Sequence, residues 1–184
     1  MDTQGLPLDH DISNYDIAYY QTLAETQTSK EPLANCILRA AKLYSVHPDY
    51  IFTLAMAEGG TMGKYRKNND GTHDMGIMQI NYERWAQDMP RIGYQVDWRK
   101  VLRNTCSNVE AGTIIFKHRA RNVTDALTAL ANYHWYVNVD MNKPHHVYKA
   151  RVKRIYTDLL RDKQSFIETG KLNSGLRCKY AACD

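Results

Sequence analysis

The sequence lacks a long hydrophobic run. No apolar stretch in its 184 residues approaches the roughly 18 residues that a membrane span needs, so we expect no transmembrane segment. The N-terminus has neither the basic stretch nor the apolar core that marks a signal peptide. We therefore expect either a cytosolic protein or one whose leader has been removed.

A strong charge of one sign is also missing. Lys and Arg number 24 against 20 Asp and Glu, which gives a formal net charge of +4 at pH 7. No basic stripe with interleaved aromatic residues is visible, so we expect no nucleic-acid partner. Hydrophobic residues make up 43% of the chain and charged residues 24%, which is ordinary for one globular domain. We expect a monomer.

Cysteine is scarce but even in number. The four cysteines are Cys36, Cys106, Cys178 and Cys183. They permit two disulfides in any of three connectivities, or four reduced thiols in a cytosolic protein, and the count alone leaves both open. Cys178 and Cys183, taken with His145 and His146, fit no standard zinc spacing. We therefore expect no metal and no cofactor.

Helical periodicity dominates the chain from Glu31 onward. It predicts helices over residues 33–44, over residues 48–58 with Pro48 at the first helical position, and over residues 75–85. Capping patterns at residues 107–110 and 124–125 begin two more helices. A last long helix starts near Pro144, and its buried stripe consists of Tyr148, Val152, Ile155 and Leu159. The predicted fold class is mainly α.

Glycine and asparagine interrupt this pattern. Residues 59–76 predict a long loop, with a small hairpin between Tyr65 and Asp74 as an alternative, and residues 88–104 fit no single element. Residues 1–30 are polar and predict a partly helical extension. Residues 31–165 form the predicted domain, and residues 166–184 a tail unless Cys178 and Cys183 close it.

One carboxylate falls on a buried helix face. If Pro48 begins its helix, then Ile51, Leu54, Ala55 and Glu58 lie on one side of it. Partial burial disfavours the charged form of a carboxyl group, which is how a glutamate becomes a proton donor near neutral pH. The two glycines that follow would let a bulky substrate approach. On spacing alone, a solvent-facing glutamate followed by a helix-ending glycine is the better interpretation.

Four motifs in order then resemble the lysozyme-like, soluble-type lytic transglycosylases. Glu58 is followed by GIMQIN at 76–81, NTCSNVEAG at 104–112 and ALANY at 129–133. The resemblance covers about residues 35–160 and is strongest to small enzymes of type III and type IV secretion and of conjugation. It implies a helical goose-type or SLT domain, with the Gly/Asn loop or a small hairpin beside the cleft.

The resemblance assigns roles to single residues. It implies that Glu58 is the catalytic acid and that Tyr133 hydrogen-bonds and orients it. The implied substrate-binding residues are Gly76, Met78, Gln79, Tyr133 and Tyr148. In the implied reaction Glu58 protonates the oxygen of the β-1,4 bond that follows N-acetylmuramic acid in peptidoglycan, and its carboxylate then accepts the proton of the C6 hydroxyl as that oxygen attacks C1. The product is a 1,6-anhydro sugar, and the partners are glycan strands and secretion or conjugation proteins.

Departures from the family pattern occur at two places. Gly59 stands where the family usually has serine, and the family's Ala-Tyr-Asn is Asn132-Tyr133-His134 here. The resemblance also implies a disulfide between Cys36 and Cys106, and with it a periplasmic or exported protein. Whether Cys178 and Cys183 form a second disulfide is left undecided by the sequence.

Two other functions remain as alternatives. Glycosidases that use water generally need a second carboxylate, and Asp70 and Asp74 are the acidic residues of the loop before the cleft. A turn role suits Asp74 better, so a goose-type muramidase is the second hypothesis. The third is a non-catalytic glycan-binding or adaptor protein, for which the Gly59 departure would be a sign of lost activity.

Overall fold

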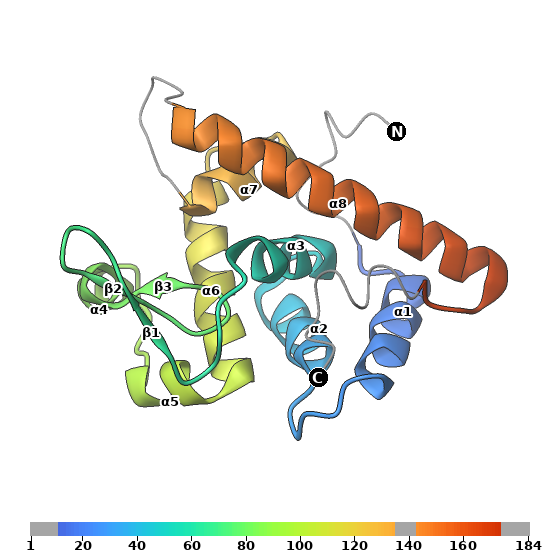
Figure 1. Ribbon diagram of the computed structural model, residues 1–184, viewed down its shortest axis with the longest axis horizontal. Coiled ribbons are helices and arrows are strands. Elements are labelled where there is room, and N and C mark those ends of the chain that lie inside the picture. The colour runs from blue at the N-terminus through green and yellow to red at the C-terminus, as the bar shows by residue number, and fades with distance from the viewer. Residues whose placement is uncertain (1–10, 135–142, 174–184) are drawn as a thin grey trace.

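The structure is a computed structural model that describes residues 11–134 and 143–173. These residues form helices and one small sheet, which confirms the mainly α prediction. The helices are α1 (Asn14–Glu25), α2 (Leu33–Tyr44), α3 (Pro48–Glu58), α4 (Tyr82–Arg91), α5 (Trp98–Arg103), α6 (Thr105–Ala120), α7 (Ala126–His134) and α8 (Lys143–Thr169). Figure 1 shows α8 running along one side of the molecule and the sheet at the opposite end from α1.

The sheet lies in the Gly/Asn loop. Its strands are β1 (Tyr65–Lys67), β2 (His73–Met75) and β3 (Ile80–Asn81), all antiparallel in the order β1-β2-β3. The hairpin alternative for this segment is therefore confirmed. The helix predicted over residues 75–85 is wrong in its first half, because Gly76 and Gln79 have positive φ angles of 68° and 44°. The helix begins only at Tyr82, where the Asn81 side chain caps it.

Helix α3 is the centre of the core. Every residue from Pro48 to Ala57 is buried, and α2, α6, α7 and α8 all contact this helix. As predicted, Pro48 is the first helical residue, and His47 caps it by accepting from the Asp49 N–H. A helix buried on all sides holds its last residue, Glu58, in a fixed place.

The neighbouring helices begin where side chains cap them. Asn104 rather than Ser107 caps α6, since its Oδ1 accepts from the Ser107 N–H at 2.8 Å. Asp125 caps α7 as predicted, by accepting from the Thr128 N–H at 2.8 Å. The predicted stripe on α8, from Tyr148 to Leu159, is buried. The segment 88–104, which the sequence left unassigned, contains the end of α4 and the short helix α5.

A disulfide joins α2 to α6. Cys36 and Cys106 are bonded, with 4.6 Å between their Cα atoms, which confirms this pairing. The segment that it encloses contains α3 and the whole sheet. Cys178 and Cys183 lie outside the described residues. Among those that are described, no helix is both long and apolar enough to cross a membrane.

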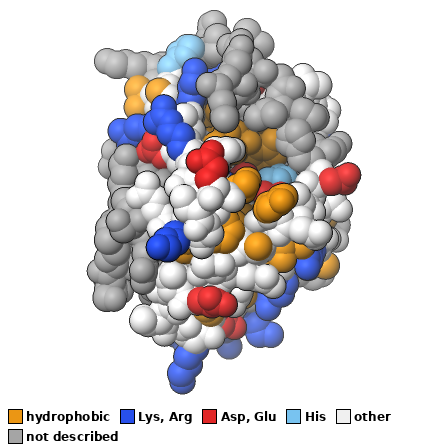
Figure 2. Space-filling model, turned by 90° about the vertical axis from the view of Figure 1, so that its right-hand side faces the viewer, with side chains coloured by type: hydrophobic (Ala, Val, Ile, Leu, Met, Phe, Trp, Pro, Cys, Tyr) orange, Lys and Arg blue, Asp and Glu red, His pale blue; other side chains and the backbone are white. Residues whose placement is uncertain are grey.

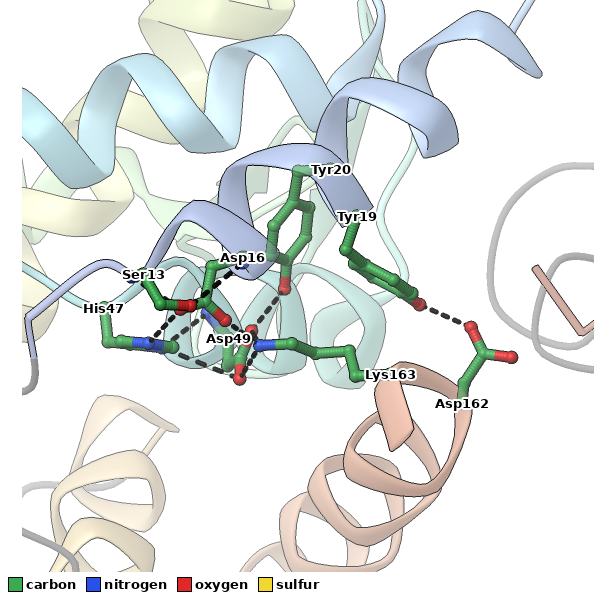
Figure 3. Close-up of polar contacts among 8 residues, drawn as sticks. All are labelled: Ser13, Asp16, Tyr19, Tyr20, His47, Asp49, Asp162 and Lys163. Carbon is green, nitrogen blue, oxygen red and sulfur yellow. Dashed lines mark hydrogen bonds and ion pairs between the residues drawn. The ribbon is translucent and has the colours of Figure 1, made fainter. Parts of the chain in front are cut away.

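Helix α1 lies in the segment predicted as an extension, yet it shares the core. Tyr19 and Tyr20 have no exposed surface, and α1 contacts α2 and α8. The Tyr20 hydroxyl donates to Asp49 at 2.9 Å, and the Tyr19 hydroxyl to Asp162 at 2.6 Å (Figure 3). The first described helix is thereby joined to the start of α3 and to the end of α8.

A buried ionic network lies at this junction (Figure 3). The Lys163 ammonium donates to Asp16 and to both oxygens of Asp49, at 2.7 and 2.9 Å for the latter. His47 lies 3.5 Å from Asp16 and 3.6 Å from Asp49. Asp16, His47 and Asp49 are close enough together to hold a metal ion. The Lys163 ammonium lies among the same oxygens and places a positive charge between the two carboxyl groups.

The outer surface near this junction is partly apolar. Figure 2 views the right-hand side of Figure 1, where α1 and the C-terminal end of α8 lie, and hydrophobic side chains gather in the middle of that face. Tyr15 on α1 is 63% exposed and Ile167 on α8 is 48% exposed.

Candidate active site

Glu58 ends α3 with its carboxyl group nearly buried. Its side chain is only 8% exposed. Gly59 follows in the left-handed conformation, with φ 60°, and its N–H donates to the Ala55 carbonyl. A serine at this position would have to adopt a conformation that costs a side-chain residue about 1–2 kcal/mol. The glycine at 59 thus follows from how the helix ends.

Gly60 makes room for the chain itself. A Cβ atom on Gly60 would lie 1.9 Å from the Gly76 carbonyl oxygen, and the Gly60 N–H donates to the Ile77 carbonyl at 3.1 Å. The space that the sequence suggested for a substrate is occupied here by the 76–79 turn. The Glu-Gly-Gly sequence therefore fixes the position of the second motif against the first.

Asn108 of α6 hydrogen-bonds the backbone of the same turn. It is fully buried, its Oδ1 accepts from the Met78 N–H at 2.9 Å, and its Nδ2 donates to the Val101 and Met75 carbonyls. A Cβ on Gly76 would lie 2.2 Å from Asn108 Nδ2, so this position requires glycine. Reasoning from the sequence missed Asn108 as a site residue, although it lies in the third motif.

Two turn residues that the sequence predicted to bind substrate, Gln79 and Met78, differ in their exposure. Gln79 is half-buried, adopts a left-handed φ of 44°, and donates from Nε2 to the Gly76 carbonyl at 2.8 Å. Such a conformation in a residue with a side chain is strained and is typical of functional sites. Met78 is fully buried and packs on Gly112. Its side chain supports the turn and presents no surface to a substrate.

Tyr148, not Tyr133, holds the carboxyl group. The Tyr148 hydroxyl donates to Glu58 Oε1 at 2.6 Å. The Tyr133 hydroxyl donates instead to the Met78 carbonyl at 2.8 Å. The contact that the resemblance implied for Tyr133 therefore comes from α8, and Tyr133 joins α7 to the 76–79 turn. Both tyrosines still lie beside Glu58, whose charge acts on each of them.

Both hydroxyl groups keep their protons. Burial raises the pKa of Tyr148 well above its usual range, and the charge of Glu58 and the hydrogen bond to it raise it further. Burial also raises the pKa of Tyr133, with a smaller contribution from the charge of Glu58. Tyr148 is thus a permanent hydrogen-bond donor to the carboxylate.

A second carboxyl group lies in β2. Burial raises the pKa of Asp74, against hydrogen bonds from Asn68 and Asn81, and the charge of Glu58 adds to the increase. Asp70 is exposed and accepts from the Thr72 N–H and hydroxyl. Asp74 is therefore the acidic residue of the loop whose pKa the charge of Glu58 affects. Asp70 is the residue whose side chain stabilises the turn.

Comparison with known proteins identifies the family. Residues 35–151 match the family described as "Transglycosylase SLT domain". This is more than half of the chain, and the chain belongs to that family. The match contains Glu58, the sheet, Tyr133 and Tyr148, whereas α1 and the last 18 residues of α8 lie outside it.

Individual relatives are more distant. The chain is 30% identical over 131 residues to a "Peptidoglycan-binding-like protein" of Escherichia coli O157:H7, which covers 67% of this chain and 77% of the relative. It is 28% identical over 83 residues to "Invasion protein IagB" of Salmonella typhimurium strain LT2 and of Salmonella typhi, which covers 45% of this chain and 50% of those proteins.

Proposed function

We propose that this protein is a peptidoglycan lytic transglycosylase with Glu58 as its catalytic acid and base. The observation that carries the proposal is the state of Glu58, a carboxyl group that is almost buried at the end of a rigid helix and accepts one strong hydrogen bond from Tyr148. A general acid must stand within reach of the atom that it protonates and must be held in one orientation, and the Tyr148 hydroxyl orients the Glu58 carboxyl group. Family membership supports peptidoglycan as the substrate.

The reaction needs one group that first donates and then accepts a proton. Glu58 would protonate the oxygen that joins N-acetylmuramic acid to N-acetylglucosamine, which breaks the β-1,4 bond. Its carboxylate would then take the proton of the C6 hydroxyl as that oxygen bonds to C1. The products are a 1,6-anhydro-N-acetylmuramic acid end and a strand that begins with N-acetylglucosamine. Gly76, Gln79, Tyr133 and Tyr148 would position the glycan.

Product analysis tests this proposal. Purified sacculi are digested with the full chain and with Glu58→Gln, and the soluble fragments are separated and weighed by mass spectrometry. We expect anhydro-muropeptides from the wild type and none from the variant, with both proteins showing the same circular dichroism spectrum. Loss of the function without loss of the fold would separate catalysis from binding. Wild-type protein that releases no fragments would favour the adaptor hypothesis.

A muramidase is the second candidate because of Asp74. This carboxyl lies near enough to Glu58 for their charges to interact, and its raised pKa reflects partial burial. A hydrolase would use such a group as the base that activates water, or as the nucleophile that forms an intermediate which water then hydrolyses. It would release reducing ends, which borohydride reduction reveals as a mass increase of about 2 Da, whereas anhydro ends do not react.

We also propose an exported location and a role in opening the wall for a secretion or conjugation apparatus. The disulfide supports an oxidising compartment. The name of one relative, an invasion protein, and the resemblance to the small enzymes of such machines support the role. Deleting the gene should then reduce secretion or transfer, and Glu58→Gln should fail to restore it.

A further inference from the structure

His134 touches the catalytic carboxyl group. It is the last residue of α7, and its Nδ1 lies 3.6 Å from Glu58 Oε1, the oxygen that also accepts the Tyr148 hydroxyl. Its ring stacks on the Tyr148 ring with 4.5 Å between centroids and 12° between planes. An asparagine, the usual residue of the family motif at this position, carries no ionisable group. This chain therefore places a titratable side chain against its acid.

The end of α7 is fixed by its neighbours. Arg119, which is buried in α6, donates to the carbonyls of Asn132 and Tyr133, and such contacts satisfy the last carbonyls of a helix. His145 of α8 hydrogen-bonds the Asn132 side chain at 3.3 Å. The backbone that carries His134 is thus held from two sides, and its ring is held by stacking although it is 47% exposed.

We propose that His134 is a positioning residue that shares one proton with Glu58 and so sets the pH range in which Glu58 acts as an acid. The inference rests on the proposed function. With one proton on the pair, either the carboxyl is neutral and the imidazole is neutral, or both are charged and form an ion pair. Protonation of His134 thus draws the pair into the state in which Glu58 has no proton to give.

Other charged groups surround this pair. Arg151 of α8 comes within 3.9 Å of the place where a Cβ on Gly59 would lie, and its charge acts on Tyr148. Arg119 and Asp74 approach from α6 and from the sheet, and both interact electrostatically with Glu58. The described groups that face the pair are Tyr133, Tyr148, Arg151, His145, Arg119 and Asp74. Two ionisable side chains of the described residues contact the Glu58 carboxyl group, Tyr148 at 2.6 Å and His134 at 3.6 Å.

A pH profile of sacculus clearing tests the proposal. Wild type, His134→Asn and His118→Asn are compared from pH 4.5 to 8, with thermal melts to verify folding. A coupling of about one pKa unit between two groups changes the protonated fraction of one of them about tenfold. His134→Asn should therefore raise the ratio of the rate at pH 5.5 to the rate at pH 7.5 about tenfold. His118 lies on α6 beside Arg121, so the same change there should leave the ratio as in the wild type. Equal ratios in all three proteins would overturn the proposal.

A second measurement does not depend on activity. The titration of the His134 ring is followed by NMR in the wild type and in Glu58→Gln. Removing the carboxylate should lower the midpoint of this titration, because a nearby negative charge favours the imidazolium. An unchanged midpoint would refute the coupling even if His134→Asn failed to fold. Absence of clearing by the wild type at every pH would instead count against the proposed function, and the NMR result would still decide whether the pair is coupled.

Discussion

The Tyr148 hydroxyl makes the shortest side-chain contact that the described residues give the Glu58 carboxyl group. The donor is buried, and its distance of 2.6 Å is at the short end of the range for O–H···O hydrogen bonds. The donor also belongs to α8, so the acid at the end of one helix is oriented by another helix that is distant in sequence.

Removing this hydroxyl should reduce activity more than stability. We expect Tyr148→Phe to slow sacculus clearing roughly 10- to 100-fold, because a hydrogen bond to a charged group contributes about 1.5–3 kcal/mol. Tyr15→Phe is the matched control, since that ring is 63% exposed on α1 and remote from Glu58 in sequence and element. Clearing rates of purified proteins decide the matter, and a Tyr148→Phe rate equal to that of the wild type would contradict the role.

Gly60 offers a second test at this scale. We expect Gly60→Ala to destabilise the protein by about 3 kcal/mol or more, at the upper end of what overpacking costs, because its Cβ would strike the Gly76 carbonyl. Gly63→Ala meets no atom within 4 Å and costs only the strain of its φ of 75°, about 1–2 kcal/mol. Urea unfolding of both variants measures the difference. Equal losses would mean that the turn yields to the added methyl group.

The position of Glu58 was easier to predict from the sequence than its contacts. Helical spacing placed it on a buried helix face, as the structure has it, and the order of the motifs made it the candidate acid; both signals are local in the chain. The donor to Glu58 could not be predicted in this way, because Tyr133 and Tyr148 both come near Glu58 and only the packing of α7 against α8 decides which hydroxyl reaches it. Met78 shows the same limit, since an alternating motif does not reveal which of its side chains turns inward.

At the scale of elements, α8 contacts both ends of α3. Its 27 residues span about 40 Å, with Tyr148 near one end at Glu58 and Lys163 near the other end at Asp49. Asp49 lies in the first turn of α3 and Glu58 is its last residue. The two helices are therefore joined at both ends of α3, once by the hydrogen bond between Tyr148 and Glu58 and once by the ion pair between Lys163 and Asp49.

Breaking the ionic contact should loosen the fold. We expect Lys163→Met to lower the free energy of unfolding by about 3–5 kcal/mol, because it leaves the buried Asp16 and Asp49 without a cation. Lys153→Met is the control, as Lys153 is exposed on the same helix. Thermal or urea unfolding gives both values. If the two variants were equally stable, the network would contribute nothing beyond what a hydrophobic side chain can replace.

The same network predicts how stability depends on pH. Burial opposes the charge of Asp16, but hydrogen bonds from His47, Lys163 and Ser13 outweigh it and hold the pKa of Asp16 well below its usual range. A depressed pKa in the folded state contributes stability above the unfolded value of about 3.9, and this contribution is lost as the pH falls below it. Melting temperatures from pH 6 to 2.5 should therefore decrease less steeply in Asp16→Asn than in the wild type. If the melting temperatures of the two proteins fell equally with pH, the pKa of Asp16 would not be lowered in the folded state.

At the scale of the whole molecule, the disulfide closes the segment that carries the acid and the sheet. The Cys36→Ser, Cys106→Ser double variant should lose about 4 kcal/mol of stability, the loop-closure estimate for cysteines 70 residues apart. Activity at 25 °C should remain, since neither cysteine touches Glu58 in the structure. Adding a thiol reductant should lower the melting temperature of the wild type but not that of the variant. Equal melting temperatures of the wild type and the double variant without reductant would show that the bond contributes no stability in solution.

The global arrangement was predictable where periodicity and capping are strong. Helices α2, α3, α7 and α8 follow the sequence pattern closely. The start of α4 was missed because two positive φ angles interrupt an apolar run. The burial of α1 was missed because its polar residues find partners only in the folded state, where Asp16 and the two tyrosines meet groups from α3 and α8.

The ionic network of Asp16, His47, Asp49 and Lys163 limits how far the chain can be truncated. A fragment trimmed to residues 35–151, the part that matches the family, would keep Asp49 but lose both Asp16 and Lys163. It would also expose the core surface that Tyr19, Tyr20 and Leu159 now cover. We therefore expect the smallest fragment that folds by itself to be longer than residues 35–151 and to run at least from Ser13, which caps α1, to Lys163.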